Sequence, residues 1–93
     1  MEQYVSLEAL KRGAEVFTNI SCVGETDLVL IHNGIVAQCD VKTMKWDPVS
    51  QLWKSNHQHK PPEDVYYVMV NPETYQIRWL RNKKPAGLEN FWN

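Results

Sequence analysis

The fold is decided by residues 27–43, which read DLVLIHNGIVAQCDVKT. Two apolar runs flank Asn33-Gly34, a dipeptide suited to the positive φ that a type I′ turn needs at both central positions. The stretch therefore predicts a β-hairpin with strands over 27–32 and 35–43. Both faces of this hairpin are largely apolar, which is typical of strands covered on two sides.

The two-residue turn also sets which side chains oppose each other. Paired positions sum to 67, as the turn residues 33 and 34 do, so Asp27 lies opposite Asp40. Opposed Cβ atoms are about 5 Å apart, and Lys42, two residues after Asp40, shares their face. Opposed carboxylates repel each other, and Mg²⁺ held with water and a substrate phosphate relieves that repulsion. The structural alternative is an ion pair of Lys42 with one Asp, with Asp27 capping the strand.

The flanking segments predict a small α/β domain. Tyr4, Leu7, Leu10 and Ala14 recur at helical spacing, which predicts a helix over 2–12 that ends at Gly13. We expect a mixed sheet of about four or five strands, with one helix before the hairpin and another after it. The other expected elements are a strand over 15–20, a helix from Asp47-Pro48 to Lys54, a polar loop over 55–63, strands over 65–70 and 75–80, and a docked tail over 87–92.

Length and composition exclude several classes of protein. With 93 residues, 43% of them hydrophobic, the chain predicts one globular domain over 1–93. It has no apolar run long enough for a membrane span and no signal-like N-terminus. Cys22 and Cys39 fit no disulfide framework, so we expect a reducing, cytoplasmic location. We expect Cys39 to be a buried thiol on the face of the sheet opposite to that of Asp40.

The charges are distributed unevenly, although the net charge is only −1. Acidic residues dominate the first forty positions and basic residues the rest, which permits a nucleic-acid surface but fits an ordinary solvated face equally well. The candidate DNA-binding residues are Lys45, Lys54, Lys60, Arg78, Arg81, Lys83 and Lys84. His57 and His59 fit a solvated loop better than a metal pair, and Trp46 and Trp53 fit packing better than base stacking.

The hairpin resembles a known group of enzymes. Residues 24–30 (GETDLVL), the Asn33-Gly34 turn and residues 39–43 (CDVKT) are similar to the PD-(D/E)XK nuclease superfamily. That group includes type II restriction enzymes, archaeal Holliday junction resolvases, and small phage and intron-encoded endonucleases. The resemblance, which spans roughly 2–81, implies a restriction-endonuclease-like core.

The resemblance also implies roles for individual residues. Asp27 and Asp40 would bind Mg²⁺, with Mn²⁺ able to substitute, and Lys42 would assist catalysis. Glu2, eleven residues before Gly13, would be the helical acid of this group, with Glu8 and Glu15 as rivals. The chain departs from the pattern at Thr26, where the motif has Pro, and it lacks a Gln-containing helix after the Lys unless Gln51 serves.

The function implied is Mg²⁺-dependent hydrolysis of DNA phosphodiester bonds, on branched DNA or at a specific duplex site. Cutting both strands needs two sites, so we expect a homodimer or higher symmetric oligomer. Aromatic residues such as Trp79, Phe91 and Trp92 are candidates for its interface. A phage-encoded enzyme of this type acts in the host cytoplasm. The alternative is a non-catalytic nucleic-acid-binding or structural module that retains the nuclease fold.

Overall fold

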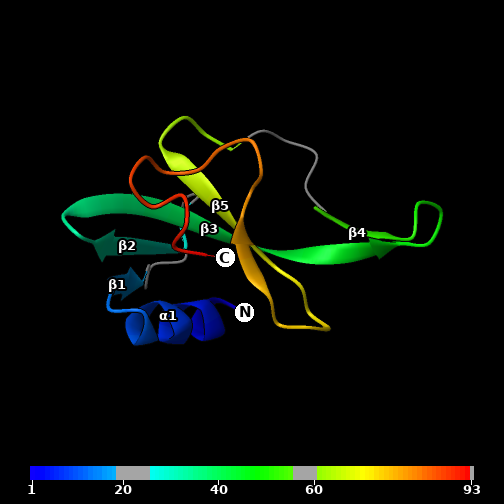
Figure 1. Ribbon diagram of the computed structural model, residues 1–93, viewed down its shortest axis with the longest axis horizontal. Coiled ribbons are helices and arrows are strands. Elements are labelled where there is room, and N and C mark those ends of the chain that lie inside the picture. Colours follow the sequence, from blue (N-terminus) through cyan, green and yellow to red (C-terminus); the bar gives the residue numbers. More distant parts are fainter. Residues whose placement is uncertain (19–25, 56–60, 93) are drawn as a thin grey trace.

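A mixed sheet with one helix makes up the described part of the chain (Figure 1). The structure is a computed structural model that describes residues 1–18, 26–55 and 61–92. The elements are α1 (Glu2–Lys11), β1 (Glu15–Thr18), β2 (Leu28–His32), β3 (Ile35–Asp47), β4 (Leu52–Ser55), β5 (Val65–Val70) and β6 (Ile77–Trp79). Within these ranges no helix has the length and apolar character needed to cross a bilayer.

The strand order is β1-β2-β3-β5-β6, and β4 pairs with the far half of β3. The β3–β5 pair is parallel, and the other pairs are antiparallel. The expected α/β fold with a small mixed sheet is confirmed. The sheet has six strands where about four or five were expected, and the described ranges contain one helix where two were expected.

The central hairpin forms as its turn chemistry predicts. Asn33 and Gly34 have φ of 52° and 77°, the positive values of a type I′ turn. The β2–β3 register pairs His32 with Ile35 and Leu28 with Cys39, in agreement with the sum of 67. Every second residue of β3 therefore faces the same side of the sheet.

One face of the sheet carries the main core. Val5 and Ala9 of α1 are fully buried there, together with Leu30 and Cys39 of the hairpin. Burial raises the pKa of the Cys39 thiol to about 12, so it stays a neutral thiol at physiological pH. The helix thus packs on the side of β3 opposite Asp40.

The C-terminal tail closes the same core. Leu88 and Trp92 are buried, and the Trp79 indole Nε1 donates a hydrogen bond of 2.8 Å to the Leu88 carbonyl. The expectation of a docked tail is confirmed. The expectation that Trp79 and Trp92 lie at a subunit interface is wrong, because both are only 2–3% exposed within a single chain.

The other face of the sheet is more open than the hairpin sequence predicts. A smaller cluster of Met44, Val65, Tyr67 and Met69 covers part of it, and no helix in the described ranges packs there. Val36 on β3 remains 60% exposed on this side. We call this the open face; it carries the even-numbered side chains of β3.

The helix expected over 47–54 is wrong. β3 runs on to Asp47, a turn follows, and β4 returns from Leu52. The Asp47 side chain accepts a hydrogen bond from the Val49 N–H at 3.0 Å, and Gln51 adopts a positive φ of 56°. Asp-Pro begins turns as readily as helices, and here the pairing of Lys45–Asp47 with β4 decides for a turn.

The buried side of α1 also differs from the periodicity argument. Leu7 and Leu10 are 52% and 53% exposed, whereas Val5 and Ala9 are buried. The small Ala9 side chain lets the helix axis approach the sheet closely, which two leucines on that side would prevent. Packing against β1 and β2 therefore overrides the pattern of apolar residues on the isolated helix.

Candidate functional site

Three charged side chains of the hairpin meet on the open face. The Lys42 Nζ lies 3.2 Å from Asp40 Oδ2. Asp27, just before β2, is held at its backbone by an N–H to Cys39 carbonyl hydrogen bond of 2.9 Å. Its Oδ2 accepts a hydrogen bond of 2.8 Å from the Val41 N–H, and its carboxyl group is close enough to that of Asp40 to raise the pKa of Asp40. The type I′ turn and strand alternation thus place all three groups together.

Burial and the adjacent Asp27 carboxyl group both disfavour the ionised form of Asp40. Asp40 is only 6% exposed. Burial, with the adjacent Asp27 carboxyl, raises the pKa of Asp40 to about 6, although Lys42 opposes the shift. Two carboxyl groups in contact cannot both stay ionised at low cost unless a cation lies between or beside them.

Lys42 supplies part of that positive charge. Burial lowers its pKa, but the ion pair with Asp40 and the charges of Tyr67 and Asp27 together outweigh burial, so the net shift is upward. Its Nζ also lies 5.3 Å from the centre of the Tyr67 ring, on the neighbouring strand β5. Lys42 is therefore a charged, positioned donor with 27% of its side chain still exposed.

The site fits a hard cation better than zinc. Within residues 1–18, 26–55 and 61–92, no group of three or more His, Cys, Asp or Glu side chains gathers at one point. Zinc sites use three or four protein ligands, whereas Mg²⁺ is usually held by one or two carboxylates with water and a substrate phosphate. Asp27 and Asp40 match the second pattern.

The acids of the first segment do not join this pair. Glu2 is exposed on α1, where it lines a groove with Leu7 and Leu10, and α1 packs on the face opposite Asp40. Glu8 pairs instead with Lys11 at 3.0 Å. The placement of Glu2 therefore gives no support to its expected role as the helical acid of the site.

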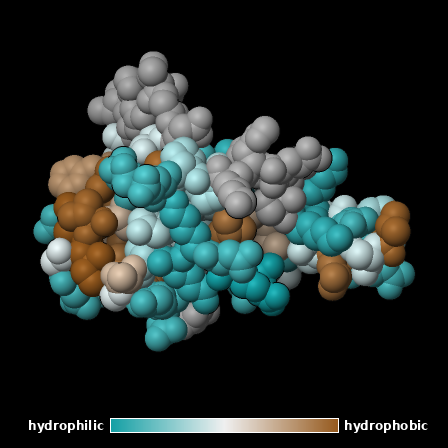
Figure 2. Space-filling view, turned by 90° about the horizontal axis from the view of Figure 1, so that it is seen from above, coloured by the Kyte–Doolittle hydropathy of each residue, from teal (hydrophilic) through white to brown (hydrophobic). Residues whose placement is uncertain are grey.

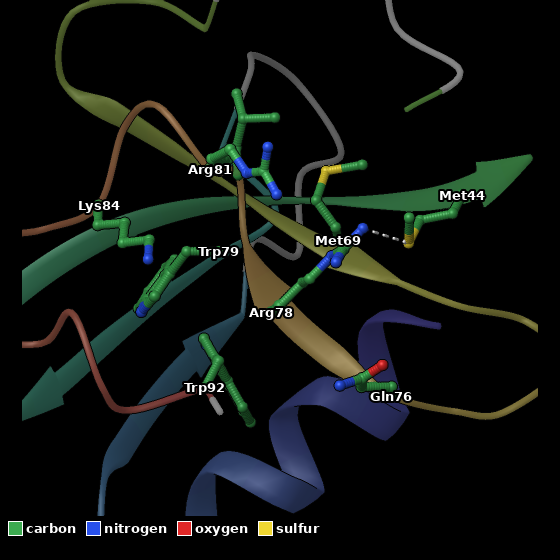
Figure 3. Close-up of a pocket in the computed structure, with 9 residues that line it drawn as sticks. Met44, Met69, Gln76, Arg78, Trp79, Arg81, Lys84 and Trp92 are labelled. Carbon is green, nitrogen blue, oxygen red and sulfur yellow. Dashed lines mark hydrogen bonds between the residues drawn. The ribbon is translucent and has the colours of Figure 1, made fainter. Parts of the chain in front are cut away.

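A basic cleft lies at the edge strand β6. Arg78, Arg81 and Lys84 line a cavity of about 430 Å³, and Figure 3 shows their side chains around this strand. The other described lining residues are Met44, Met69, Gln76, Trp79, Leu80 and Trp92, none of them acidic. Among the described residues, the hydrogen bond given for these three basic side chains is the one from the Arg78 guanidinium to the Met44 sulfur, at 3.9 Å. We call this cavity the β6 cleft.

The sheet register connects the β6 cleft to the carboxylate pair. Lys42 pairs with Met69 of β5, and Met69 pairs with Arg78 of β6. Neighbouring strands lie about 4.8 Å apart, so the Cα atoms of Lys42 and Arg78 are roughly 10 Å apart across the open face. Sequence reasoning named both residues but could not place them side by side, because neither pairing is local.

Lys83 differs from its basic neighbours. Its ammonium donates to the carbonyls of Pro62 and Glu63, the latter at 2.7 Å, and lies over the Tyr66 ring. Lys83 therefore ties the segment before β5 to the segment after β6. The structure thus gives Lys83 a structural role, and its expected role as a DNA contact stays a prediction.

The remaining basic candidates lie near the β3–β4 turn or outside the described residues. Lys54 pairs with Asp47 at 3.1 Å, whereas Lys45 is exposed and forms no ion pair with another described residue. Trp46 and Trp53 pair edge to face, with ring centres 5.6 Å apart. Lys60, His57 and His59 lie outside the described residues.

The comparisons with known proteins find a similar fold among solved structures. The chain is similar to a solved bacterial homing endonuclease, I-Ssp6803I, with a TM-score of 0.70 over 95% of this chain. The similarity is one of fold. Sequence identity is 19%, and the chain spans 62% of the length of that protein. No family model and no curated protein matches the sequence.

Proposed function

We propose that this protein is a metal-dependent DNA endonuclease whose site is formed by Asp27, Asp40 and Lys42. The observation that carries the proposal is their geometry on the open face: the Asp27 carboxyl group is close enough to that of Asp40 to raise its pKa, and Lys42 Nζ lies 3.2 Å from Asp40 Oδ2. The similarity of the fold to a homing endonuclease supports it. The substrate class, duplex DNA, is taken by analogy with that neighbour.

Each residue has a distinct part in the proposed reaction. Asp27 and Asp40 would hold Mg²⁺ or Mn²⁺, which would supply Lewis-acid stabilisation of the charge that develops on the phosphate. Lys42 turns an N–H from Asp40 towards a non-bridging phosphate oxygen. Water adds to phosphorus and gives up a proton as one P–O ester bond breaks, and the leaving oxygen gains a proton, so that the water is divided between the phosphate and the released hydroxyl group.

In this proposal, the β6 cleft binds the phosphates of the DNA backbone. Arg78, Arg81 and Lys84 offer three positive charges without an acidic partner among the described lining residues. The Lys42 and Arg78 backbones are roughly 10 Å apart, and both side chains are long. They can therefore contact two nearby phosphates of one DNA strand. Bound DNA would thus extend from the carboxylate pair to β6.

Cutting both strands of a duplex requires two such sites, so we also propose a symmetric homodimer. The core positions of Trp79 and Trp92 exclude them from its interface, which must use other residues. Light scattering should give a mass of at least twice 10.9 kDa at micromolar concentration. A monomer that still cuts both strands would contradict the dimer.

Nicking of supercoiled plasmid tests the endonuclease directly. The parent protein should nick the plasmid with Mg²⁺ or Mn²⁺ and not in EDTA, and Asp40→Asn should remove the activity. The matched control is Asp47→Asn, which removes a partly exposed carboxylate of the same strand that pairs with Lys54 outside the site. Binding of DNA without nicking in any of these metals would favour the non-catalytic binding module instead.

A further inference from the structure

Two tryptophans lie on the part of the sheet that projects from the body of the molecule. After Met44, β3 pairs with β4 alone among the described strands, and the pair extends away from the other strands (Figure 1). We call residues 44–55 the ribbon. Figure 2 shows it as a narrow arm on the right. Trp46 and Trp53 are paired directly across its two strands.

Strand alternation puts both tryptophans on the open face. Trp46 is an even-numbered residue of β3, so its side chain shares a face with those of Asp40, Lys42 and Met44. Trp53 lies on the same face, because directly opposed residues of two antiparallel strands point to the same side. A molecule bound over the carboxylate pair can therefore continue along β3 onto the two indole rings.

The tryptophan pair is only partly covered by the protein. Trp53 is half-buried and packs against the cluster that contains Met44. Trp46 meets Trp53 edge to face, with ring centres 5.6 Å apart, yet Trp46 remains 45% exposed. The core tryptophans Trp79 and Trp92 are only 2–3% exposed by comparison. Trp46 therefore offers an aromatic surface to a ligand, supported from one side by Trp53.

The tryptophan pair continues the β6 cleft. Met44 lines that cleft, and its sulfur accepts a hydrogen bond of 3.9 Å from the Arg78 guanidinium (Figure 3). Met44 also belongs to the ribbon, and Trp53 packs against its cluster. Basic side chains thus lead, by way of Met44, to an exposed aromatic ring. Basic groups bind phosphates and aromatic rings stack on bases, so the ligand that fits both is a nucleic-acid strand with a free base.

We propose that Trp46 stacks on an unpaired base, so that the protein prefers DNA in which a single-stranded stretch adjoins a duplex. This inference rests on the proposed function and names its substrate class. Bases inside a duplex are stacked on their neighbours, so a protein ring reaches the face of a base where that base has left the stack. Proteins that bind single strands combine a positively charged groove with aromatic side chains in this way.

The stacking contact lies at a distance from the reacting phosphate. Trp46 follows Asp40 by six residues of the same strand, which corresponds to roughly 20 Å. Loss of the Trp46 ring should therefore weaken binding of DNA with unpaired bases and leave the cutting of bound DNA intact. Phosphate contacts in the β6 cleft, and with them the salt dependence of binding, should not change.

Equilibrium binding to labelled oligonucleotides in EDTA tests the proposal. One substrate is a duplex with a single-stranded flap, and the other carries a flap of the same length without bases. Both flaps have the same phosphates, so only contacts to the bases separate them. The parent should bind the flap with bases roughly tenfold more tightly. Trp46→Ala should bind both substrates equally, with the salt slope of the parent.

Two further variants control for the fold of the ribbon. Trp46→Phe keeps an aromatic ring and should retain most of the preference for bases, which keeps the proposal testable if Trp46→Ala unfolds the ribbon. Leu52→Ala is the matched control, because it removes a side chain that is 58% exposed on the other side of the ribbon. It should keep the full preference.

Equal binding of the two flaps by the parent, or an unchanged preference in Trp46→Ala, would overturn the inference. So would a fall in the oligomeric mass of Trp46→Ala with the preference intact, which would assign the ring to a second copy of the chain. A parent that prefers the bases through Trp46 but never nicks plasmid would end the endonuclease proposal and leave the stacking contact standing. A parent that nicks plasmid and does not distinguish the flaps would do the reverse.

Discussion

At the scale of single residues, the shifted pKa of Asp40 makes stability depend on pH. The pKa rises from 3.8 to about 6 on folding, so the folded state binds the proton more tightly than the unfolded state does. The resulting stabilisation is complete below about pH 4 and is lost as pH rises through 6. Without metal, the melting temperature of the parent should therefore fall between pH 4 and 7, as thermal melts in EDTA will measure. The loss is at most roughly 3 kcal/mol, about two pKa units.

Asp40→Asn should remove this pH dependence. The neutral amide keeps the shape of the carboxyl group, so the variant in EDTA at pH 7 should be at least as stable as the parent. Loss of the Lys42 ion pair offsets part of the gain, but only part, because 27% of the Lys42 side chain is exposed to water. A variant that melts far below the parent at pH 7 would identify Asp40 and Lys42 as a structural ion pair.

At the scale of secondary-structure elements, the type I′ turn aligns the two carboxylates. Gly34 has φ of 77°, and a Cβ built there meets no atom within 4 Å, so Gly34→Ala costs backbone strain alone. The expected destabilisation is about 1 kcal/mol. For a domain of this size that lowers the melting temperature by roughly 4–8 °C.

The neighbouring turn position provides a matched control. Asn33 already adopts a positive φ of 52°, so Asn33→Gly should change the melting temperature little or raise it. Equal losses for Gly34→Ala and Asn33→Gly would mean that side-chain contacts, and not backbone conformation, hold the turn.

At the scale of the whole molecule, the net charge of −1 means that the proposed DNA binding must depend on a local basic surface. Replacing Arg78, Arg81 and Lys84 together by Ala should weaken binding to all sequences alike. Each lost phosphate contact reduces the slope of log K against log salt by about 0.9. Three contacts in each of two subunits would therefore flatten the slope by about five.

Lys83→Ala is the control for this triple variant. Its ammonium is engaged with Pro62 and Glu63, so this change should lower the melting temperature and leave the salt slope unchanged. Titrations of a labelled duplex at several salt concentrations measure both slopes. A triple variant with the slope of the parent would show that the β6 cleft is an ordinary solvated face.

The sequence by itself determined the hairpin and the grouping of Asp27, Asp40 and Lys42. The reason is local: Asn33-Gly34 specifies the turn, the strand register runs from it to the Leu28–Cys39 pair, and Asp27 follows directly with hydrogen bonds to Cys39 and Val41. No contact from elsewhere in the chain is needed for that alignment.

The tertiary structure alone decided which features surround this site. Pairing of β3 with β5 and of β5 with β6 places Arg78 two strands away from Lys42 on the same face of the sheet. The two residues are far apart in the sequence, so no local sequence pattern predicts this arrangement. Pairing with β4 likewise turns the Asp47-Pro48 segment into a ribbon, and packing against the sheet buries Ala9 in place of Leu7. In each case the free energy comes from contacts with distant segments, which outweigh the small conformational preferences of the segment itself.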